Sequence, residues 1–233
     1  MLVRDVMTAD PITIRPQGDP RAALGLCKSA HIRRLPVLDG EGRVVGIVTR
    51  GMLERFLATA PPPTIQARQH GITQVMVSPV ITVSSDDPME EAARLMVAHQ
   101  IGSLPVLEDG RLVGIVTETD IFKEFVEILG GQTAALRMTV VVPDVPGSLA
   151  RLATAVAGLG GNIRSAIILP CEDSGCRAVT LWIDGSSREA LTGAVAGIEG
   201  VRLTRLWSPP PGGWHTGVVS PAPTREKPSP RER

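Results

Sequence analysis

Aromatic side chains are scarce in this sequence: Phe, Trp and Tyr make up 3% of its 233 residues, and Tyr is absent. Proteins that bind single-stranded nucleic acid stack the bases on such rings. The formal net charge of zero supplies no general attraction for polyanions either. We therefore expect neither nucleic acid nor an anionic membrane surface among the partners.

Long apolar runs and an even set of cysteines are also missing. No run approaches the roughly 20 apolar residues that span a bilayer, and residues 1–5 lack the apolar core of a secretion signal. Three cysteines are a poor basis for a disulfide framework. These features predict a cytoplasmic protein that does not enter membranes.

Signatures of catalysis are absent as well. The sequence has no nucleophile–base arrangement, no phosphate-binding Gly-x-x-x-x-Gly-Lys loop and no dinucleotide-binding Gly-x-Gly-x-x-Gly. Cys171 and Cys176 are separated by four residues with no His nearby, which is poor spacing for zinc. We expect a hairpin turn that carries two thiols, no catalytic residue, no metal site and no required cofactor.

What the chain does contain is an internal repeat, offset by about 68 residues, over residues 1–130. Each copy predicts a short β-branched strand, a helix opened by an Asp-Pro pair, two strands joined by a Gly-containing turn, and a closing helix. The paired segments are 6–14 with 75–83, 35–38 with 104–107, and 45–49 with 113–117, and the two first strands are expected at 12–14 and 80–83.

From Met138 the pattern changes to the element order βαββαβ, a ferredoxin-like arrangement. Its strands are expected at 138–142, 163–169, 178–183 and 201–207. The residues that follow are rich in Pro, Gly and charge, and cannot bury enough apolar area to offset their ordering entropy.

The repeat resembles a tandem pair of CBS domains, on the strength of Val-Met-Thr-Ala-Asp-Pro-Ile-Thr-Ile at 6–14, the Leu-Pro-Val segments and the doubled Gly-Ile-Val-Thr. The later module resembles an ACT domain, through residues 144–149 and the Gly-Gly-Asn-Ile at 160–163. In domain order the chain is similar to bacterial regulatory proteins of the acetoin-utilisation (AcuB) type.

The fold class that follows is α/β (α+β). It comprises a CBS pair with pseudo-twofold symmetry, a ferredoxin-like ACT domain and a disordered tail. The expected boundaries are 1–60 for the first CBS domain, 61–71 for a linker, 72–131 for the second CBS domain, 136–207 for the ACT domain and 208–233 for the tail.

The CBS resemblance implies an adenine nucleotide such as AMP, ADP or ATP, bound in a cleft between the two copies. In the family's pattern Asp120 holds the ribose hydroxyls and Thr117 helps to hold phosphate. By the same resemblance Arg33 and Arg34 reach phosphates across the cleft, while Pro79, Val80 and Ile81 line the adenine pocket. The local pattern alone favours a second interpretation, in which Thr117 caps a helix and Asp120 completes a capping box.

The first copy departs from the family pattern, because Met52 stands where the second copy has Asp120. A thioether cannot replace a carboxylate that accepts hydrogen bonds from a diol. We therefore expect one anchored nucleotide site in each chain.

The ACT resemblance implies homodimerisation and an amino-acid site that uses Asp144, Gly147 and Asn162. The glycines are also explained as turn residues without any ligand. Taken together, the sequence predicts a non-enzymatic regulatory sensor. Two alternatives stay open: an assembly module that has no ligand, and an enzyme.

Overall fold

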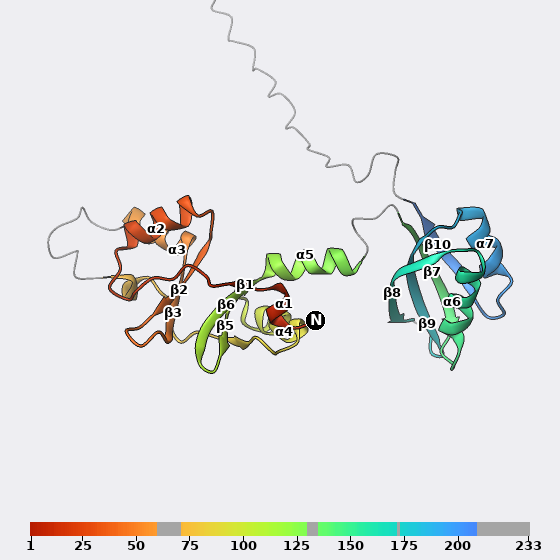
Figure 1. Cartoon of the computed structure of the whole chain (residues 1–233), viewed down its shortest axis with the longest axis horizontal. Helices are drawn as coiled ribbons and strands as arrows, with labels where there is room; N and C mark the ends of the chain where they lie inside the picture. The colour runs from red at the N-terminus through yellow and green to blue at the C-terminus, as the bar shows by residue number, and fades with distance from the viewer. Residues whose placement is uncertain (60–70, 130–134, 172, 209–233) are drawn as a thin grey trace, which may run out of the picture. The chain divides into compact units, whose positions relative to one another are not determined.

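The computed structural model describes residues 1–59, 71–129, 135–171 and 173–208. The described residues divide into two compact units, one within Met1–Val126 and one that begins at Glu127 (Figure 1). None of the described helices is long and apolar enough to cross a membrane. The predicted linker at 61–71, except Gly71, and the predicted tail at 208–233, except Ser208, fall outside the described residues.

The first unit contains both copies of the repeat, and its mixed α/β character agrees with the sequence prediction. Each copy consists of a helix, a β-hairpin and a second helix. In the first repeat these are α2 (Pro20–Ser29), β2 (Arg34–Leu38), β3 (Val44–Thr49) and α3 (Arg50–Thr59). In the second repeat they are α4 (Met89–His99), β5 (Ser103–Glu108), β6 (Arg111–Thr117) and α5 (Glu118–Ile128).

Local chemistry explains where several of these elements begin and turn. The Asp19 carboxylate accepts a hydrogen bond from Arg21 N at 2.8 Å and caps α2. The Asp87-Pro88 pair of the second copy predicts the same kind of cap, but this prediction is wrong: α4 begins after Pro88, and the Asp87 carboxylate accepts from Ser84 N instead. Between β5 and β6, Asp109 and Gly110 have φ of 49° and 75°, as a two-residue type I′ turn requires.

The expected first strands are shorter than the sequence suggests. Residues 12–14 form no strand, and Ile14 makes only an isolated bridge to Val37. The strand expected at 80–83 is reduced to β4 (Val83–Ser84). The reason is that the preceding residues of each repeat leave their own hairpin and pair with the hairpin of the other repeat.

This exchange is visible in the backbone hydrogen bonds. The segment at 1–9, which contains α1 (Val3–Val6) and β1 (Thr8–Ala9), adds β1 to the second repeat's sheet, in the order β1-β6-β5-β4. The segment at 72–77, which contains the 3-10 helix η2 (Ile72–Gln74), returns to the first repeat, where Val77 and Ile47 exchange hydrogen bonds of 2.9 and 3.1 Å. We call these two stretches the lead segments.

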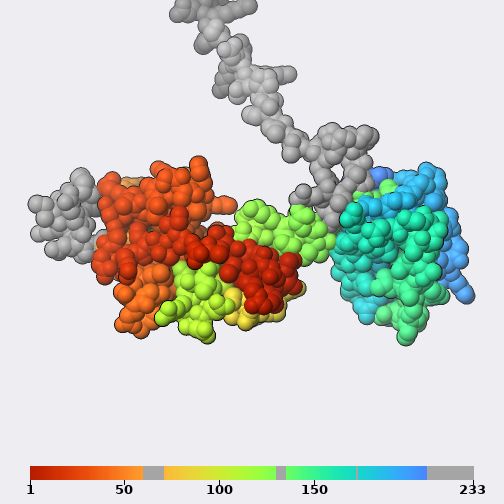
Figure 2. All heavy atoms as spheres, in the orientation of Figure 1, coloured from red at the N-terminus to blue at the C-terminus, as the bar shows by residue number. Residues whose placement is uncertain are grey.

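The hydrophobic cores follow the same exchange. Val3 is fully buried in the core of the second repeat, while Ile72 and Val75 are buried in the core of the first. In Figure 2 the red N-terminal residues lie against the yellow atoms of the second repeat. Neither core is therefore complete without a lead segment from the other repeat.

Two glycines make room for the crossing lead segments. A Cβ at Gly114 would collide with the side chain of Met7, and a Cβ at Gly46 would collide with Met76. Each methionine comes from a lead segment, and each glycine comes from the Gly-Ile-Val-Thr motif of the repeat that the segment joins. The methionine of one repeat's lead segment and the glycine of the other repeat's Gly-Ile-Val-Thr motif therefore pack against each other.

The second unit is a four-stranded antiparallel sheet with helices on one face. Its elements are β7 (Leu136–Pro143), α6 (Ser148–Gly158), β8 (Asn162–Pro170), β9 (Cys176–Asp184), α7 (Arg188–Ala196) and β10 (Arg202–Trp207). The strand order is β10-β7-β9-β8, and α6 and α7 lie together over one face of the sheet (Figure 1). On the opposite face the Arg137 guanidinium stacks 5.2 Å above the Trp182 ring. The element order βαββαβ is the predicted one.

Gly114→Ala should destabilise the first unit by about 1–3 kcal/mol, because the added methyl group overpacks the contact with Met7. Gly25→Ala is the matched control: a Cβ there meets nothing within 4 Å, and alanine should stabilise the helix by up to about 1 kcal/mol. Urea unfolding of the full chain followed by circular dichroism measures both changes. Equal stability of the two variants would contradict the role given to the glycine–methionine contact.

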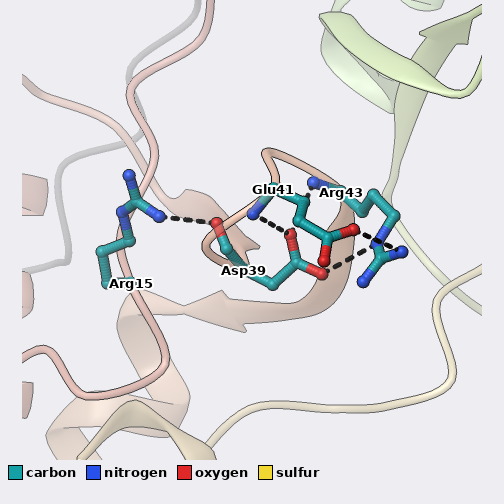
Figure 3. Close-up of polar contacts among 4 residues, drawn as sticks. All are labelled: Arg15, Asp39, Glu41 and Arg43. Carbon is teal, nitrogen blue, oxygen red and sulfur yellow. Dashed lines mark hydrogen bonds and ion pairs between the residues drawn. The ribbon is translucent and has the colours of Figure 1, made fainter.

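The turn between β2 and β3 is organised by one carboxylate (Figure 3). Asp39 Oδ1 accepts hydrogen bonds from the backbone N–H groups of Glu41 and Arg43, each at 2.9 Å. Its Oδ2 accepts from Arg43 Nε at 2.9 Å, and its backbone oxygen accepts from Arg15 at 2.6 Å. The bonds to the carboxylate lower the pKa of Asp39 below its ordinary value of 3.8, and the largest contribution comes from the Arg43 backbone N–H.

A carboxyl group whose pKa is lowered by folding stabilises the folded state while it is ionised. Its contribution is fully present above the unfolded pKa of 3.8 and is lost as the pH falls through the lower folded pKa. Asp39→Asn should therefore lower Tm at pH 7, and the difference from the natural protein should shrink as the pH falls below about 4. Glu41→Gln removes only an exposed ion pair to Arg43 and should change Tm little. An Asp39→Asn deficit that is the same at pH 7 and pH 2.5 would sink this explanation.

Candidate functional site

A cavity of about 310 Å³ opens in the first unit between the two repeats. This volume lies near the lower end of small-molecule sites, which span roughly 300–1,000 Å³. One wall is apolar, one edge carries carboxylates and hydroxyls, and another carries two guanidinium groups. The lining residues are Thr8, Asp10, Pro11, Ile12, Ile32, Arg33, Arg34, Ile115, Thr117, Thr119 and Asp120.

Thr117 and Asp120 lie at the start of α5 and form a reciprocal capping box. Asp120 Oδ2 accepts from Thr117 N at 2.9 Å and from Thr117 Oγ1 at 2.7 Å, while Asp120 N donates to Thr117 Oγ1 at 3.3 Å. The second carboxylate oxygen, Oδ1, accepts no hydrogen bond from the residues that the structure describes. The cap fixes the carboxylate and leaves one oxygen available, so helix capping and ligand binding are compatible here.

Arg33 and Arg34 reach the same cavity from the other repeat. The Arg34 guanidinium packs against the bare Cα of Gly102, beside the Glu118 carboxylate. Burial, followed by repulsion from Arg33, lowers the pKa of Arg34, and the nearby Glu118 and Asp120 partly offset both effects. A guanidinium remains charged under such shifts, because its ordinary pKa lies far above neutral pH. The result is a half-buried positive charge facing the Asp120 edge.

Pro79, Val80 and Ile81 do not line this cavity, contrary to the expectation from the sequence. Their counterparts in the repeat alignment, Asp10, Pro11 and Ile12, line it instead. The exchange of lead segments is the physical reason: Thr8 pairs with Ile115 beside the Asp120 site, whereas Val77 pairs with Ile47 of the first repeat. Ile81 packs against the core of the second repeat.

The sequence reasoning also missed several lining residues. These are Thr8, Asp10, Pro11, Ile12, Ile32, Ile115 and Thr119. The repeat offset identifies residues 10–12 as equivalents of 79–81, but it does not say which hairpin each lead segment joins. Both hairpins end in the same Gly-Ile-Val-Thr motif, so the sequence does not indicate which hairpin each lead segment joins.

A second cavity, of about 410 Å³, lies at the start of α3 and shares Arg33 and Arg34 with the first. Its remaining lining residues are Thr49, Arg50, Gly51 and Glu54. The Met52 amide donates to Thr49 Oγ1 at 3.3 Å, as the Asp120 amide does to Thr117, but the Met52 side chain packs against the hydrophobic core. This cavity therefore has neither a carboxylate matching Asp120 nor the apolar wall.

In the second unit the predicted amino-acid site does not assemble within one chain. Asp144 follows β7, next to the β8–β9 turn, where its N–H donates to Gly175 O at 2.9 Å and its carboxylate pairs with Arg177 at 2.9 Å. Gly147, with φ of 87°, caps the start of α6. Asn162 follows the other end of α6 and pairs with Asp184 at the opposite end of the sheet. The 11-residue helix α6 separates them by about 16 Å along its axis.

The described part of the chain contains no cluster of metal-binding side chains. No group of three or more His, Cys, Asp or Glu side chains there could hold an ion. The first cavity combines acidic, basic and apolar groups in one lining.

Comparison with known proteins gives one family match. The CBS domain model matches residues 3–59 and 72–127. A CBS domain-containing protein of Dictyostelium discoideum is 33% identical over 138 residues, which cover 55% of this chain and 94% of that protein. An inosine-5′-monophosphate dehydrogenase of Bifidobacterium longum is 33% identical over 118 residues, which cover 50% of this chain but only 21% of the enzyme.

Solved structures also match somewhat more than half of this chain. The CBS domain pair of protein MJ0100, in complex with 5′-methylthioadenosine and S-adenosyl-L-methionine, is 31% identical, with 57% of this chain and 98% of that chain covered and a TM-score of 0.48. A Vibrio cholerae protein described as an acetoin utilization protein (AcuB) is 29% identical, with 57% and 95% covered and a TM-score of 0.49.

Proposed function

Because the chain belongs to the family of CBS domain proteins, we propose that its first unit is a regulatory sensor that binds an adenine nucleotide in the cavity at Asp120. The observation that carries the proposal is the convergence of three kinds of group in one cavity of about 310 Å³. A fixed carboxylate, an aliphatic wall and two guanidinium groups match a ribose, a base and a phosphate.

The ribose is held by Asp120. Its Oδ2 is occupied by the helix cap, while Oδ1 is available to accept from a ribose hydroxyl. A hydrogen bond to a charged acceptor contributes about 1.5–3 kcal/mol. The cap supplies rigidity as well, because the carboxylate is fixed before the ligand arrives and loses less rotamer freedom on binding.

The base and the phosphate occupy the other two parts of the cavity. Pro11, Ile12 and Ile115 offer an aliphatic surface for the purine ring. Arg33 and Arg34 form planar forks suited to phosphate oxygens, and the N-terminus of α5 favours an anion. Since both arginines also line the second cavity, additional phosphates would extend in that direction.

Regulation, rather than catalysis, fits these parts. A ligand can act only through different affinities for two conformations. Helix α5 begins at the Thr117–Asp120 cap, and its last residues belong to the second unit. Occupancy of the cavity therefore acts directly on the segment that leads into the second unit. The acetoin-utilisation type remains a prediction drawn from domain order, and a ligand-free assembly module remains the second candidate.

We expect isothermal titration of the full chain to show one adenine nucleotide site per chain, from a panel of AMP, ADP, ATP, NAD and S-adenosylmethionine. Asp120→Asn should weaken binding about 10- to 100-fold, because a hydrogen bond to a charged acceptor is lost. The 2′-deoxy form of the best ligand should bind the natural protein more weakly, while Asp120→Asn should barely distinguish the two forms.

Met52→Ala is the matched control at the equivalent position of the first repeat, and it should leave nucleotide affinity unchanged. Two sites per chain, or loss of binding in Met52→Ala with retention in Asp120→Asn, would refute the assignment. Absence of any thermal shift across the panel at high ligand concentration would instead favour the assembly module, since a ligand present at a hundred times its Kd stabilises by about 2.7 kcal/mol.

We infer that the second unit is an ACT domain through which two copies associate. The element order βαββαβ and the loop from Asp144 into α6 support this assignment. Strand β8 is an edge strand whose Ile168 and Leu169 are 49% and 56% exposed. Exposed edges of this kind pair readily with another copy. An amino-acid site that uses Asp144, Gly147 and Asn162 would need groups from both copies.

Sedimentation of the full chain should show a dimer, and Ile168→Lys should raise its dissociation constant about tenfold or more, by placing a charge in a buried apolar contact. Val97→Lys is the control, because Val97 is 79% exposed on α4 and lies outside the proposed contact. A dimer that survives Ile168→Lys unchanged but is lost in Phe122→Lys would move the interface to α5 and contradict the proposal.

A further inference from the structure

The end of the β8–β9 hairpin carries two cysteines whose positions face each other across the strands. Pro170 pairs with Arg177 in the antiparallel register, so the next pair outward is Cys171 with Cys176. Residues directly opposite in such a ladder have Cα atoms about 4.5–5.5 Å apart. A disulfide needs a separation of about 4.4–6.8 Å, so the two residues can be linked without a change of backbone register.

We propose that Cys171 and Cys176 form a reversible dithiol–disulfide site that reacts by exchange with low-molecular-weight disulfides such as oxidised glutathione. Both cysteines are free thiols in the reduced form, and they lie close enough for Cys171 to influence the pKa of Cys176. Both are partly exposed, so a small disulfide can reach them. Cys27, the third cysteine, is fully buried and has no such access.

The contact also indicates which sulfur reacts first. The hydrogen bond to Cys171, followed by burial, raises the pKa of Cys176 to about 11. The Cys176 S–H additionally donates to Asp173 O at 3.3 Å. Cys176 therefore keeps its proton near neutral pH. The attacking group is then Cys171, because the thiolate is the nucleophile in exchange.

The exchange is balanced as follows. The Cys171 thiolate attacks one sulfur of a disulfide R–S–S–R, so that a Cys171–S–S–R bond forms and one R–S⁻ leaves. Cys176 then loses its proton and attacks the Cys171 sulfur, which forms the Cys171–Cys176 bond and releases the second R–S⁻. The two protein thiols give up two electrons and two protons, and the small disulfide takes them up as two R–SH.

The site is tied to the loop that opens α6. Gly175, in the same turn, accepts from the Asp144 amide, and Arg177 next to Cys176 pairs with the Asp144 carboxylate. Oxidation would fix the end of the hairpin on which this loop rests. The inference does not depend on the nucleotide site, which belongs to the other unit, and each can fail without the other.

The test equilibrates the full chain in glutathione buffers of varied GSH:GSSG ratio. Free thiols are then trapped with iodoacetamide, before and after denaturation, and the peptides are mapped by mass spectrometry. The expected result is an intramolecular Cys171–Cys176 disulfide that appears as the buffer becomes oxidising and disappears with dithiothreitol. Cys27 should be labelled only after denaturation.

Cys176→Ser and Cys171→Ser are the matched controls, and each should stop at a single glutathione adduct on the remaining cysteine of the pair. The proposal is overturned if the natural protein also stops at glutathione adducts, forms only disulfide-linked dimers, or keeps both thiols free in buffers that oxidise the denatured chain.

Discussion

The exchange of lead segments between the two repeats is the interaction on which the first unit depends. Backbone pairing of Thr8 with Ile115, and of Val77 with Ile47, carries each lead segment to the other repeat's hairpin. Buried Val3 and Ile72 then complete the two cores reciprocally. Because buried apolar area is the main driving force of folding, neither repeat has a full core alone. The two repeats are thereby held as one compact unit with a cavity between them.

The cavity is asymmetric for the same reason. The Asp120 carboxylate comes from the second repeat, whereas Asp10, the arginines and part of the apolar wall come from the first. Each repeat contributes what the other lacks: Gly102 and Ser103 stand where the first repeat has Arg33 and Arg34, and Met52 stands where the second has Asp120. The two cavities therefore differ: the first contains Asp120, whereas the second has Met52 at the equivalent position and no carboxylate matching Asp120.

In the second unit the two features proposed to be functional, an apolar edge strand and a pair of thiols, both lie at the margins of the sheet. Strand β8 exposes an apolar edge, and the turn that follows it brings two thiols together. The core itself is conventional, with alternate residues of β7 and β9 buried under Leu152, Val156, Leu191 and Val195. The sheet thus supplies a rigid support, and both proposed activities of this unit lie where the backbone pairing ends.

Much of the fold follows from local patterns in the sequence. The repeat offset, the Gly-containing turns and the alternation of apolar residues predicted the hairpins, the closing helices and the βαββαβ order, because periodicity and turn chemistry act over a few neighbouring residues. The strands at 12–14 and the cap at Asp87 were wrong, since tertiary pairing and a nearby backbone donor, Ser84 N, competed with the local preference.

The sequence by itself determined the residues at the start of α5, because Thr117 and Asp120 lie on one helical turn and their contact is local. It also determined the approach of Cys171 to Cys176, since a short turn must join two strands in register. Only the tertiary structure decided that residues 10–12, rather than 79–81, line the cavity. This outcome depends on pairing between distant segments. Because both hairpins end in the same Gly-Ile-Val-Thr motif, the linear sequence does not distinguish the two possible partners.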